Sequence, residues 1–250
     1  MEEKIMLHRG YKGKYPENSR KAFENALKEN RSFETDIRVS KDGVCFMIHD
    51  DNIDRLMNGS GKISDMTSEE LKRFHYKEDE TQGLCSLKEV CELAGKFKHN
   101  NLIFIHIKEL KDVERVIDVL RRYNLHENIR FFAVDEIEKE FKKMMRASFP
   151  EYQIGLYFSD GSEINEKEFE NADFIWADEK TDKENITEEL VNFAHSKGKP
   201  VYAISPELIP ESSFNANIEK RWLEFLEAGV DMICTDSPQK FQEFLMKVDI

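Results

Sequence analysis

The sequence predicts an α/β protein built on a parallel sheet. Short apolar runs alternate with segments of helical spacing along most of the chain, and several of these segments end at a glycine. The length of 250 residues matches the roughly 250 residues of a single β/α barrel. The motifs GxGxxG and GxxxxGKS do not occur in the sequence, so no motif supports an open nucleotide-binding sheet. We therefore expect one domain over residues 1–250.

The first elements are expected before residue 50. A strand covers 5–7, and Asn18-Ser19 can cap the helix that follows it. Strands are expected over 33–39 and 44–48, joined by a turn at Lys41-Asp42-Gly43. No crossover helix fits between these two strands, so this part of the chain departs from regular βα alternation.

A small surface insertion is expected after the third strand, over about residues 52–85. Two glycines mark a loop at 58–61, Thr67 and Glu70 have the spacing of a capping box, and a polar run covers 77–83. The insertion thus separates the first three strands from the rest of the sheet.

Alternation resumes after the insertion. Helices are expected over 87–97, 113–123, 136–148, 187–196, 218–228 and from 238 onward, and strands over 102–107, 129–134, 153–158, 174–177, 200–204 and 232–235. The chain then has nine strand candidates for the eight positions of a barrel. One of them must lie outside the barrel or be irregular.

The net charge argues against two classes of partner. The chain carries 50 acidic and 37 basic residues, a formal net charge of −13, which disfavours nucleic acid or an anionic membrane as a stable partner. A small anion can still bind where a cleft supplies local positive charge. The composition leaves the oligomeric state open.

The four cysteines indicate a reducing compartment. Cys45 and Cys234 lie in apolar, strand-like runs, Cys85 and Cys91 show no CxxC spacing, and the opening residues Met1–Lys4 lead directly into the first strand without a signal-like segment. We therefore expect reduced thiols and a cytoplasmic location.

Polar side chains end three apolar runs near the amino terminus, at His8-Arg9-Gly10, Glu34-Thr35-Asp36 and His49-Asp50. Imidazole titrates near neutral pH, so two histidines at neighbouring strand ends suit a general acid and a general base at a phosphorus atom. Residues two apart on a strand share a face, so Glu34 and Asp36 can share a hard divalent cation. Taken singly, each histidine is also typical of a structural residue, and each carboxylate of an exposed acidic surface.

These motifs resemble the N-terminal signature of the glycerophosphodiester phosphodiesterases. Two further motifs match in order and spacing, Pro16-Glu17-Asn18-Ser19 and Lys41-Asp42-Gly43. The resemblance implies a TIM-type (β/α)8 barrel, slightly irregular here, and metal-dependent hydrolysis of a glycerophosphodiester to an alcohol and glycerol 3-phosphate. It also implies that His8 and His49 are the acid–base pair and that Glu34 and Asp36 bind Mg²⁺ or Ca²⁺.

The resemblance assigns supporting roles to three more residues. Arg9 is implied to bind the phosphate, which suits a guanidinium. Glu17 is implied to lie near the site and orient a histidine or a ligand, and it can alternatively complement the dipole of the following helix. Asp50 is implied to support the site by hydrogen bonding.

The sequence departs from the family pattern at its third metal ligand. The family has an apolar strand ending Glu-x-Lys, whereas this chain has His106 in place of the glutamate and keeps Lys108. Lys108 shares a face with His106 and can neutralise a phosphate oxygen. Histidine favours Mn²⁺ or Zn²⁺ over Mg²⁺ or Ca²⁺. The metal site is therefore expected to have changed its ion, weakened its binding or lost it.

A second departure follows the strand at 200–204, where the family has Trp-Thr and this chain has none. Trp176 can occupy related space, although a core role suits it as well, and Thr235-Asp236-Ser237-Pro238 restores the family's C-terminal pattern. Three alternatives stay open: a lapsed barrel that binds a phosphate ligand, a phosphodiesterase for a sugar- or lipid-linked diester, and cyclisation in place of hydrolysis.

Overall fold

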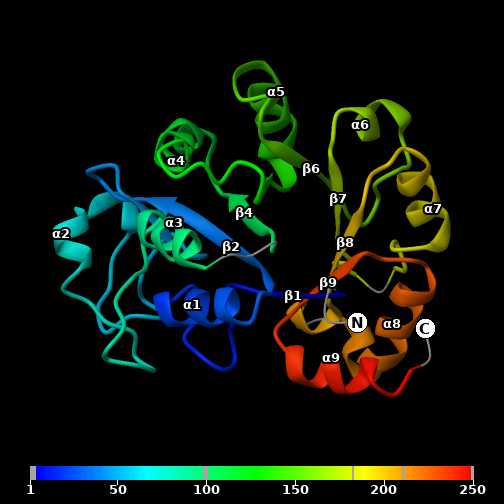
Figure 1. The fold of residues 1–250 in the computed structure, drawn as a ribbon, viewed down its shortest axis with the longest axis horizontal. Helices are drawn as coiled ribbons and strands as arrows, with labels where there is room; N and C mark the ends of the chain where they lie inside the picture. Colours follow the sequence, from blue (N-terminus) through cyan, green and yellow to red (C-terminus); the bar gives the residue numbers. More distant parts are fainter. Residues whose placement is uncertain (1–3, 98–100, 182, 210–211, 249–250) are drawn as a thin grey trace. The chain divides into compact units, whose positions relative to one another are not determined.

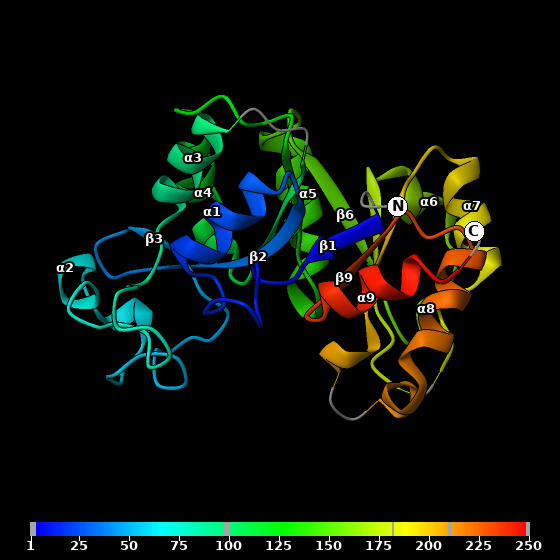
Figure 2. The same cartoon turned by 60° about the horizontal axis from the view of Figure 1, so that its bottom comes forward.

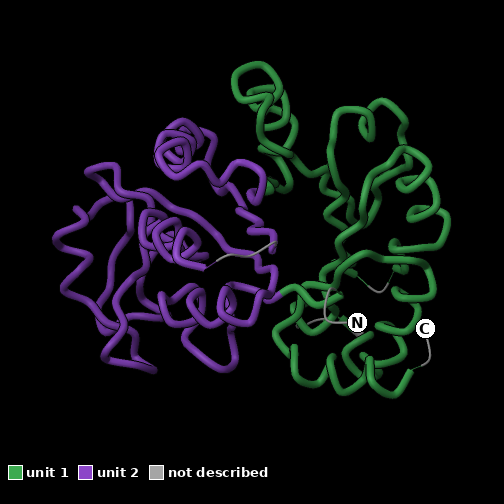
Figure 3. Tube along the Cα trace, viewed as in Figure 1, with its two compact units in different colours: residues 1–6, 130–250 green, residues 7–129 purple. Residues whose placement is uncertain are grey.

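A computed structural model of the chain describes residues 4–97, 101–181, 183–209 and 212–248. The chain divides into two compact units (Figure 3). The N-terminal unit comprises residues 7–129, and the C-terminal unit comprises residues 1–6 and 130–250. That residues 1–250 form one domain stays a prediction.

The N-terminal unit is built on two parallel strands. Strand β2 (Ser32–Val39) pairs in parallel with β4 (Ile103–Ile107), and Asp36 lies opposite His106 in the register. Side chains alternate between the faces of a strand, so Glu34, Asp36 and His106 share one face. The helices of this unit are α1 (Arg20–Lys28), α2 (Ser68–Leu71), α3 (Leu87–Lys96) and α4 (Val113–Leu120), with 3₁₀ turns η2 (Ile63–Asp65) and η3 (Leu110–Asp112).

The irregular strand is β3 (Cys45–Met47), which runs antiparallel to β2 (Figure 2). The turn before it is tight: Gly43 donates its N–H to Ser40 O at 2.9 Å and has φ +85°, a conformation that favours glycine. The chain therefore folds back along β2 as a hairpin and does not continue as a parallel barrel strand. The N–H of Ile48 bonds Asp36 O at 3.0 Å, which brings His49 back to the level of Asp36.

Capping residues fix the predicted helix starts. Ser19 accepts from the N–H of Ala22 at the start of α1, and Thr67 begins α2 with the predicted capping box. A second capping box joins Ser86 and Glu89 at the start of α3.

The segment after β3 has an apolar cluster of its own. Its fully buried members come from β3 and from the following loops and turns: Phe46, Ile48, Ile53, Met57, Ile63, Leu71 and Tyr76. The Tyr76 hydroxyl donates to the backbone carbonyl of Glu17 at 2.8 Å. The polar run at 77–83 lies on the surface, but the segment as a whole is packed and tied to the Glu17 loop.

The C-terminal unit alternates strand and helix as predicted (Figure 1). Its sheet has the order β1-β9-β8-β7-β6-β5, and consecutive strands from β5 to β9 pair in parallel. The strands are β1 (Ile5–Leu7) and β5 (Ile129–Phe132), each with one end residue assigned to the N-terminal unit, and β6 (Gln153–Phe158), β7 (Phe174–Ala177), β8 (Val201–Ile204) and β9 (Met232–Thr235). Its α-helices are α5 (Glu138–Ser148), α6 (Glu166–Glu170), α7 (Glu188–Ser196), α8 (Ile218–Glu227) and α9 (Pro238–Leu245), and its 3₁₀ turns are η4 (Asp135–Ile137), η5 (Pro206–Leu208) and η6 (Ser213–Asn217).

The periodicity predicted the strands and α-helices of this unit to within a few residues, except for α6. That helix has five residues and a single buried one, Phe169, so it has no apolar periodicity to detect. Gly198 and Gly229 follow α7 and α8 with φ +69° and +94°, as expected for glycines that end helices.

Two general expectations concern the cysteines and the membrane. All four cysteines are buried and free. Among the described residues, no helix combines the length and the apolar character needed to cross a bilayer.

Candidate active site

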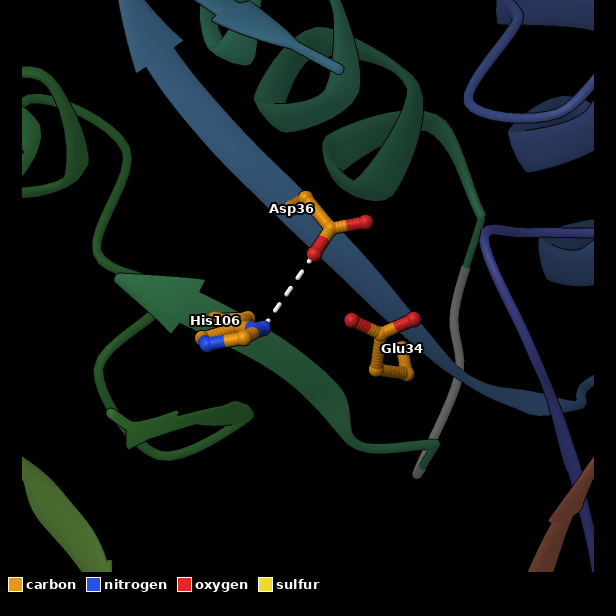
Figure 4. Close-up of side chains that lie close together, drawn as sticks. All are labelled: Glu34, Asp36 and His106. Atoms are coloured by element: carbon orange, nitrogen blue, oxygen red, sulfur yellow. Dashed lines mark ion pairs between the residues drawn. The ribbon is translucent and has the colours of Figure 1, made fainter. Parts of the chain in front are cut away.

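Two carboxylates and an imidazole converge on the shared face of β2 and β4. Glu34, Asp36 and His106 point toward one another (Figure 4), and each offers a ligand atom within 4.8 Å of the others. His106 Nδ1 lies 3.2 Å from Asp36 Oδ1. The pairing register produces this arrangement, because it sets Asp36 opposite His106.

The two carboxylates are buried in close proximity. Their side chains are 3% and 2% exposed, for Glu34 and Asp36. Burial raises the pKa of Glu34, and the charge of Asp36 raises it further. Burial also opposes the ionisation of Asp36, but Lys108, His106 and Arg9 outweigh it and hold its pKa well below the usual range. The pair therefore requires nearby positive charge.

Cationic side chains already lie beside Asp36. Lys108 Nζ is 2.8 Å from Asp36 Oδ1, and Arg9 Nε is 3.4 Å from Asp36 Oδ2. Lys108 Nζ also lies 2.9 Å from His106 Nδ1. Lys108 thus binds the carboxylate and the histidine that replaces the family's glutamate.

The donor set fits a divalent cation. Asp36 Oδ2 accepts no hydrogen bond from the described part of the chain beyond its 3.4 Å ion pair with Arg9 Nε, although such buried oxygens are normally bonded. Burial lowers the pKa of His106 to about 4, so its imidazole is neutral at pH 7, the form that binds metals. Two carboxylates and one imidazole suit Mn²⁺ or Zn²⁺ as well as harder ions.

The two histidines of the predicted acid–base pair differ in their partners. His8 Nε2 lies 3.7 Å from Glu34 Oε2. His49 has a side chain that is 40% exposed, and its Nδ1 lies 2.9 Å from Asp50 Oδ1. Burial opposes ionisation of Asp50, but hydrogen bonds from Arg55 and His49 lower its pKa. An ionised carboxylate only accepts hydrogen bonds, so His49 Nδ1–H donates and Nε2 keeps a lone pair.

Arg55 is a residue of this site that the sequence reasoning missed. Its Nε donates to Asp50 Oδ2 at 2.7 Å, and its Nη1 and Nη2 donate to both oxygens of Glu17 at 3.0 and 2.7 Å. Glu17 also accepts from Arg9 Nη1 at 2.8 Å. Arg55 lies in the expected surface insertion, where neither periodicity nor a motif singled it out. Its proximity to His49-Asp50 in the sequence was the one available signal.

The predicted residues, together with Arg55, thus form two groups within the N-terminal unit. The first group surrounds the carboxylates: His8, Arg9, Glu34, Asp36, His106 and Lys108. The second comprises His49, Asp50, Arg55 and Glu17. A cavity of about 570 Å³ adjoins Glu17 and Arg55, a size in the range of small-molecule sites.

Two further residues of interest belong to the C-terminal unit. Trp176 is buried in β7 and stacks on Phe132 with ring centroids 4.2 Å apart, as a core residue does. Thr235 ends β9, and its hydroxyl donates to Glu207.

Known proteins resemble this chain over nearly its whole length. A model described as the glycerophosphoryl diester phosphodiesterase family matches residues 8–240. A glycerophosphodiester phosphodiesterase from Bacillus altitudinis is 28% identical over 249 residues, which cover 95% of this chain and 96% of that protein.

Solved structures are similar over the same extent. The crystal structure described as a glycerophosphodiester phosphodiesterase from Galdieria sulphuraria matches with a TM-score of 0.79 at 25% identity, and the match covers 97% of both chains. An Oleispira antarctica phosphodiesterase in complex with the product sn-glycerol-3-phosphate matches with a TM-score of 0.78 at 20% identity, covering 97% of this chain and 96% of that one. The predicted fold class, a TIM-type (β/α)8 barrel with one additional strand, is confirmed.

Proposed function

The chain belongs to the glycerophosphoryl diester phosphodiesterase family, a family of phosphoric diester hydrolases, and on that premise we propose that it hydrolyses a glycerophosphodiester to an alcohol and glycerol 3-phosphate. The observation that carries the proposal is the convergence of Glu34, Asp36 and His106 on one strand face, with a histidine beside Glu34. The Oleispira relative was solved with this product, which supports the substrate class.

The metal is the first part of the proposal. Glu34, Asp36 and His106 would hold a divalent cation, which supplies Lewis-acid stabilisation of the phosphate when bound. The imidazole of His106 favours Mn²⁺ or Zn²⁺, whereas the family resemblance favours Mg²⁺ or Ca²⁺.

The two histidines would move the protons. The lone pair on His49 Nε2 suits a general base that takes a proton from the attacking water as the water oxygen bonds phosphorus. His8 would donate a proton to the leaving alcohol oxygen as the second phosphorus–oxygen bond breaks. Asp50 fixes the His49 tautomer through the 2.9 Å contact at Nδ1.

Two cations would bind the phosphate. Arg9 and Lys108 lie beside Asp36 and place positive charge at the carboxylates, where a phosphate anion would otherwise be repelled. The supply of local charge is necessary because the chain as a whole carries −13. We also propose a cytoplasmic location for the enzyme, on the reduced cysteines expected there.

The experiment measures hydrolysis of glycerophosphoethanolamine by the purified protein, with the release of glycerol 3-phosphate as the readout. The protein is first treated with a chelator, and Mg²⁺, Ca²⁺, Mn²⁺ or Zn²⁺ is then added separately. We expect turnover to return with Mn²⁺ or Zn²⁺ more than with Mg²⁺ or Ca²⁺. No turnover with any metal would contradict the proposal and favour a lapsed barrel or a different diester.

The variant His106→Glu tests the metal assignment. Glutamate restores an all-oxygen donor set, so we expect the affinity for Mg²⁺ relative to Mn²⁺ to rise about 10-fold, measured by calorimetry without substrate. His195→Glu is the control, because His195 lies on α7 in the C-terminal unit. An unchanged ratio of affinities in a folded His106→Glu protein would remove His106 from the ligand set.

A further inference from the structure

One side chain of the second group, Arg55, holds two carboxylates of that group, and one of these contacts Arg9 of the first group. Arg55 binds two carboxylates at once: Asp50 through Nε at 2.7 Å and Glu17 through both terminal nitrogens. Each carboxylate in turn contacts a residue with a proposed role, because Asp50 binds His49 and Glu17 binds Arg9.

We infer that Arg55 is a positioning residue that fixes His49 through Asp50 and Arg9 through Glu17. This inference rests on the proposed function for its kinetic consequences, but its structural consequence at His49 is independent of turnover. Arg55 makes no proposed contact with the substrate phosphate and acts through the two carboxylates.

The contact of Arg55 with Asp50 sets the tautomer of the His49 imidazole. Arg55 Nε and Nη2 lie 2.7 and 3.3 Å from the two oxygens of Asp50, so the carboxylate is held at both ends. Its Oδ1 then faces His49 Nδ1 at 2.9 Å. A fixed acceptor at Nδ1 keeps the proton there and leaves Nε2 free. Without Arg55, the Asp50 side chain would be free to rotate away from the imidazole.

The contact of Arg55 with Glu17 orients the buried guanidinium of Arg9. Glu17 is 4% exposed, and its Oε1 accepts from both Arg55 Nη2 and Arg9 Nη1. Burial opposes ionisation of Glu17, but hydrogen bonds from Arg55 lower its pKa. Arg55 therefore maintains the negative charge that orients Arg9.

The backbone around Arg55 is built to hold it. Ile53 and Met57 flank it in sequence and are fully buried in the apolar cluster of the insertion. The N–H of Met57 bonds Ile53 O at 2.8 Å, closing a helical turn around Arg55. The Tyr76 hydroxyl donates to the backbone carbonyl of Glu17, the other partner of Arg55. The packing of the insertion thus fixes the backbone on either side of Arg55, and Glu17 and Asp50 then hold its guanidinium.

An arginine is required because its donors form a planar fork. Three nitrogens of Arg55 reach two carboxylates in different directions, whereas the single ammonium of lysine cannot bind both in this way. Lysine would keep the charge and lose the geometry. The comparison of Arg55→Lys with Arg55→Ala therefore separates positioning from simple charge.

The first measurement is the nitrogen spectrum of the histidine rings in protein labelled with ¹⁵N-histidine. The sequence has 7 histidines, and His49→Gln identifies the signal of His49. We expect a neutral His49 with its proton on Nδ1 in the wild type, and a shift toward the Nε2–H tautomer in both Arg55→Ala and Arg55→Lys. Glu17→Gln, which leaves the Asp50 contact intact, should leave the His49 signal unchanged.

The second measurement is steady-state turnover of glycerophosphoethanolamine with saturating metal. We expect Asp50→Asn to lower mainly kcat and Glu17→Gln to raise mainly KM, each by about 10- to 100-fold, the range typical of residues that orient active-site groups. Arg55→Ala should change both parameters, and adding Asp50→Asn to it should lower kcat little further. Arg146→Ala is the matched control, because Arg146 also binds a carboxylate, Asp173, at 2.9 Å but in the C-terminal unit.

The outcomes separate the two hypotheses. A folded Arg55→Ala protein whose His49 tautomer is unchanged would overturn the inference, and so would Arg55→Lys with wild-type kcat and KM. If the wild type shows no turnover, the proposed function fails, but a loss of the Nδ1–H tautomer in Arg55→Ala would still support the positioning of His49. If the wild type turns over the substrate and Arg55→Ala has the same kcat, KM and His49 tautomer, only the inference about Arg55 is overturned.

Discussion

Two buried carboxylate clusters, one in each unit, are partnered to different degrees. In the C-terminal unit, Glu179 accepts from Nε and Nη2 of Arg221 and from the backbone N–H groups of Asn185 and Ile186. In the N-terminal unit, Asp36 Oδ2 has no hydrogen-bond partner among the described residues, and a second carboxylate, Glu34, lies on the same strand face.

The difference indicates what each cluster is for. A buried carboxylate whose two oxygens both accept hydrogen bonds, as at Glu179, connects secondary-structure elements and does not depend on a ligand for its partners. Glu34 and Asp36 share a strand face, and the charge of Asp36 raises the pKa of Glu34. The side chains around them therefore do not fully compensate their negative charge. The first cluster is structural, and the second is suited to an incoming cation.

The largest expected effect is on catalysis, in Asp36→Asn. The amide removes one negative ligand and places a hydrogen-bond donor beside Lys108, so we expect turnover to fall about 10³-fold, equivalent to about 4 kcal/mol of transition-state stabilisation. The unfolding free energy should change by less than about 2 kcal/mol, because the repulsion between Asp36 and Glu34 is also removed. Assays with saturating Mn²⁺ and urea denaturation measure the two effects. A large loss of stability with retained turnover would reverse the assignment of the two clusters.

The next effect is on stability, in Glu179→Gln. This change removes the charge of the buried partner of the Arg221 guanidinium, which is 4% exposed, and breaking a buried pair costs about 3–5 kcal/mol. Denaturation by urea measures the loss, and metal affinity by calorimetry should stay at the wild-type value. Glu224→Gln is the matched control, because Glu224 binds the same arginine at 2.7 Å but is 30% exposed, and it should lose less stability. Equal losses in the two variants would argue against the structural interpretation of Glu179.

The sequence predicted which residues meet in the carboxylate cluster but not the strand register that brings them together. Glu34 and Asp36 are two apart in an apolar run, which is enough to place them on one strand face. That Asp36 lies opposite His106 depends on the register of β2 and β4, which is set by long-range packing and not by local pattern. The sequence indicated that one of the nine strands is irregular or outside the barrel without identifying β3 as that strand, because hairpin and parallel strands share the same apolar alternation.

Arg55 shows why the rest could not be predicted. Its role depends on two carboxylates, one close in sequence at Asp50 and one distant at Glu17, and their convergence follows from the packing of Ile53, Met57 and Tyr76. A polar segment with a loop signal is indistinguishable in sequence from a solvated excursion. Charge networks of this kind become visible only when the fold is known.

The smallest expected effect is on the pH dependence of kcat/KM, which reports the protonation of His49. Burial lowers the pKa of His49 below its ordinary value of about 6.5. A general base must be neutral, so activity should persist below pH 6.5 and fall only as His49 becomes protonated at lower pH. The hydrogen bond that His49 donates to Asp50 acts in the opposite direction and raises this pKa, so Asp50→Asn should move the acid limb to still lower pH while reducing the plateau.

A pH–rate profile of both proteins at saturating Mn²⁺ measures the shift. Asp231→Asn is the control, because Asp231 binds His195 at 2.9 Å in the C-terminal unit. An acid limb that moves to higher pH in Asp50→Asn would show that His49 is not the base, since removing a carboxylate partner favours the neutral imidazole.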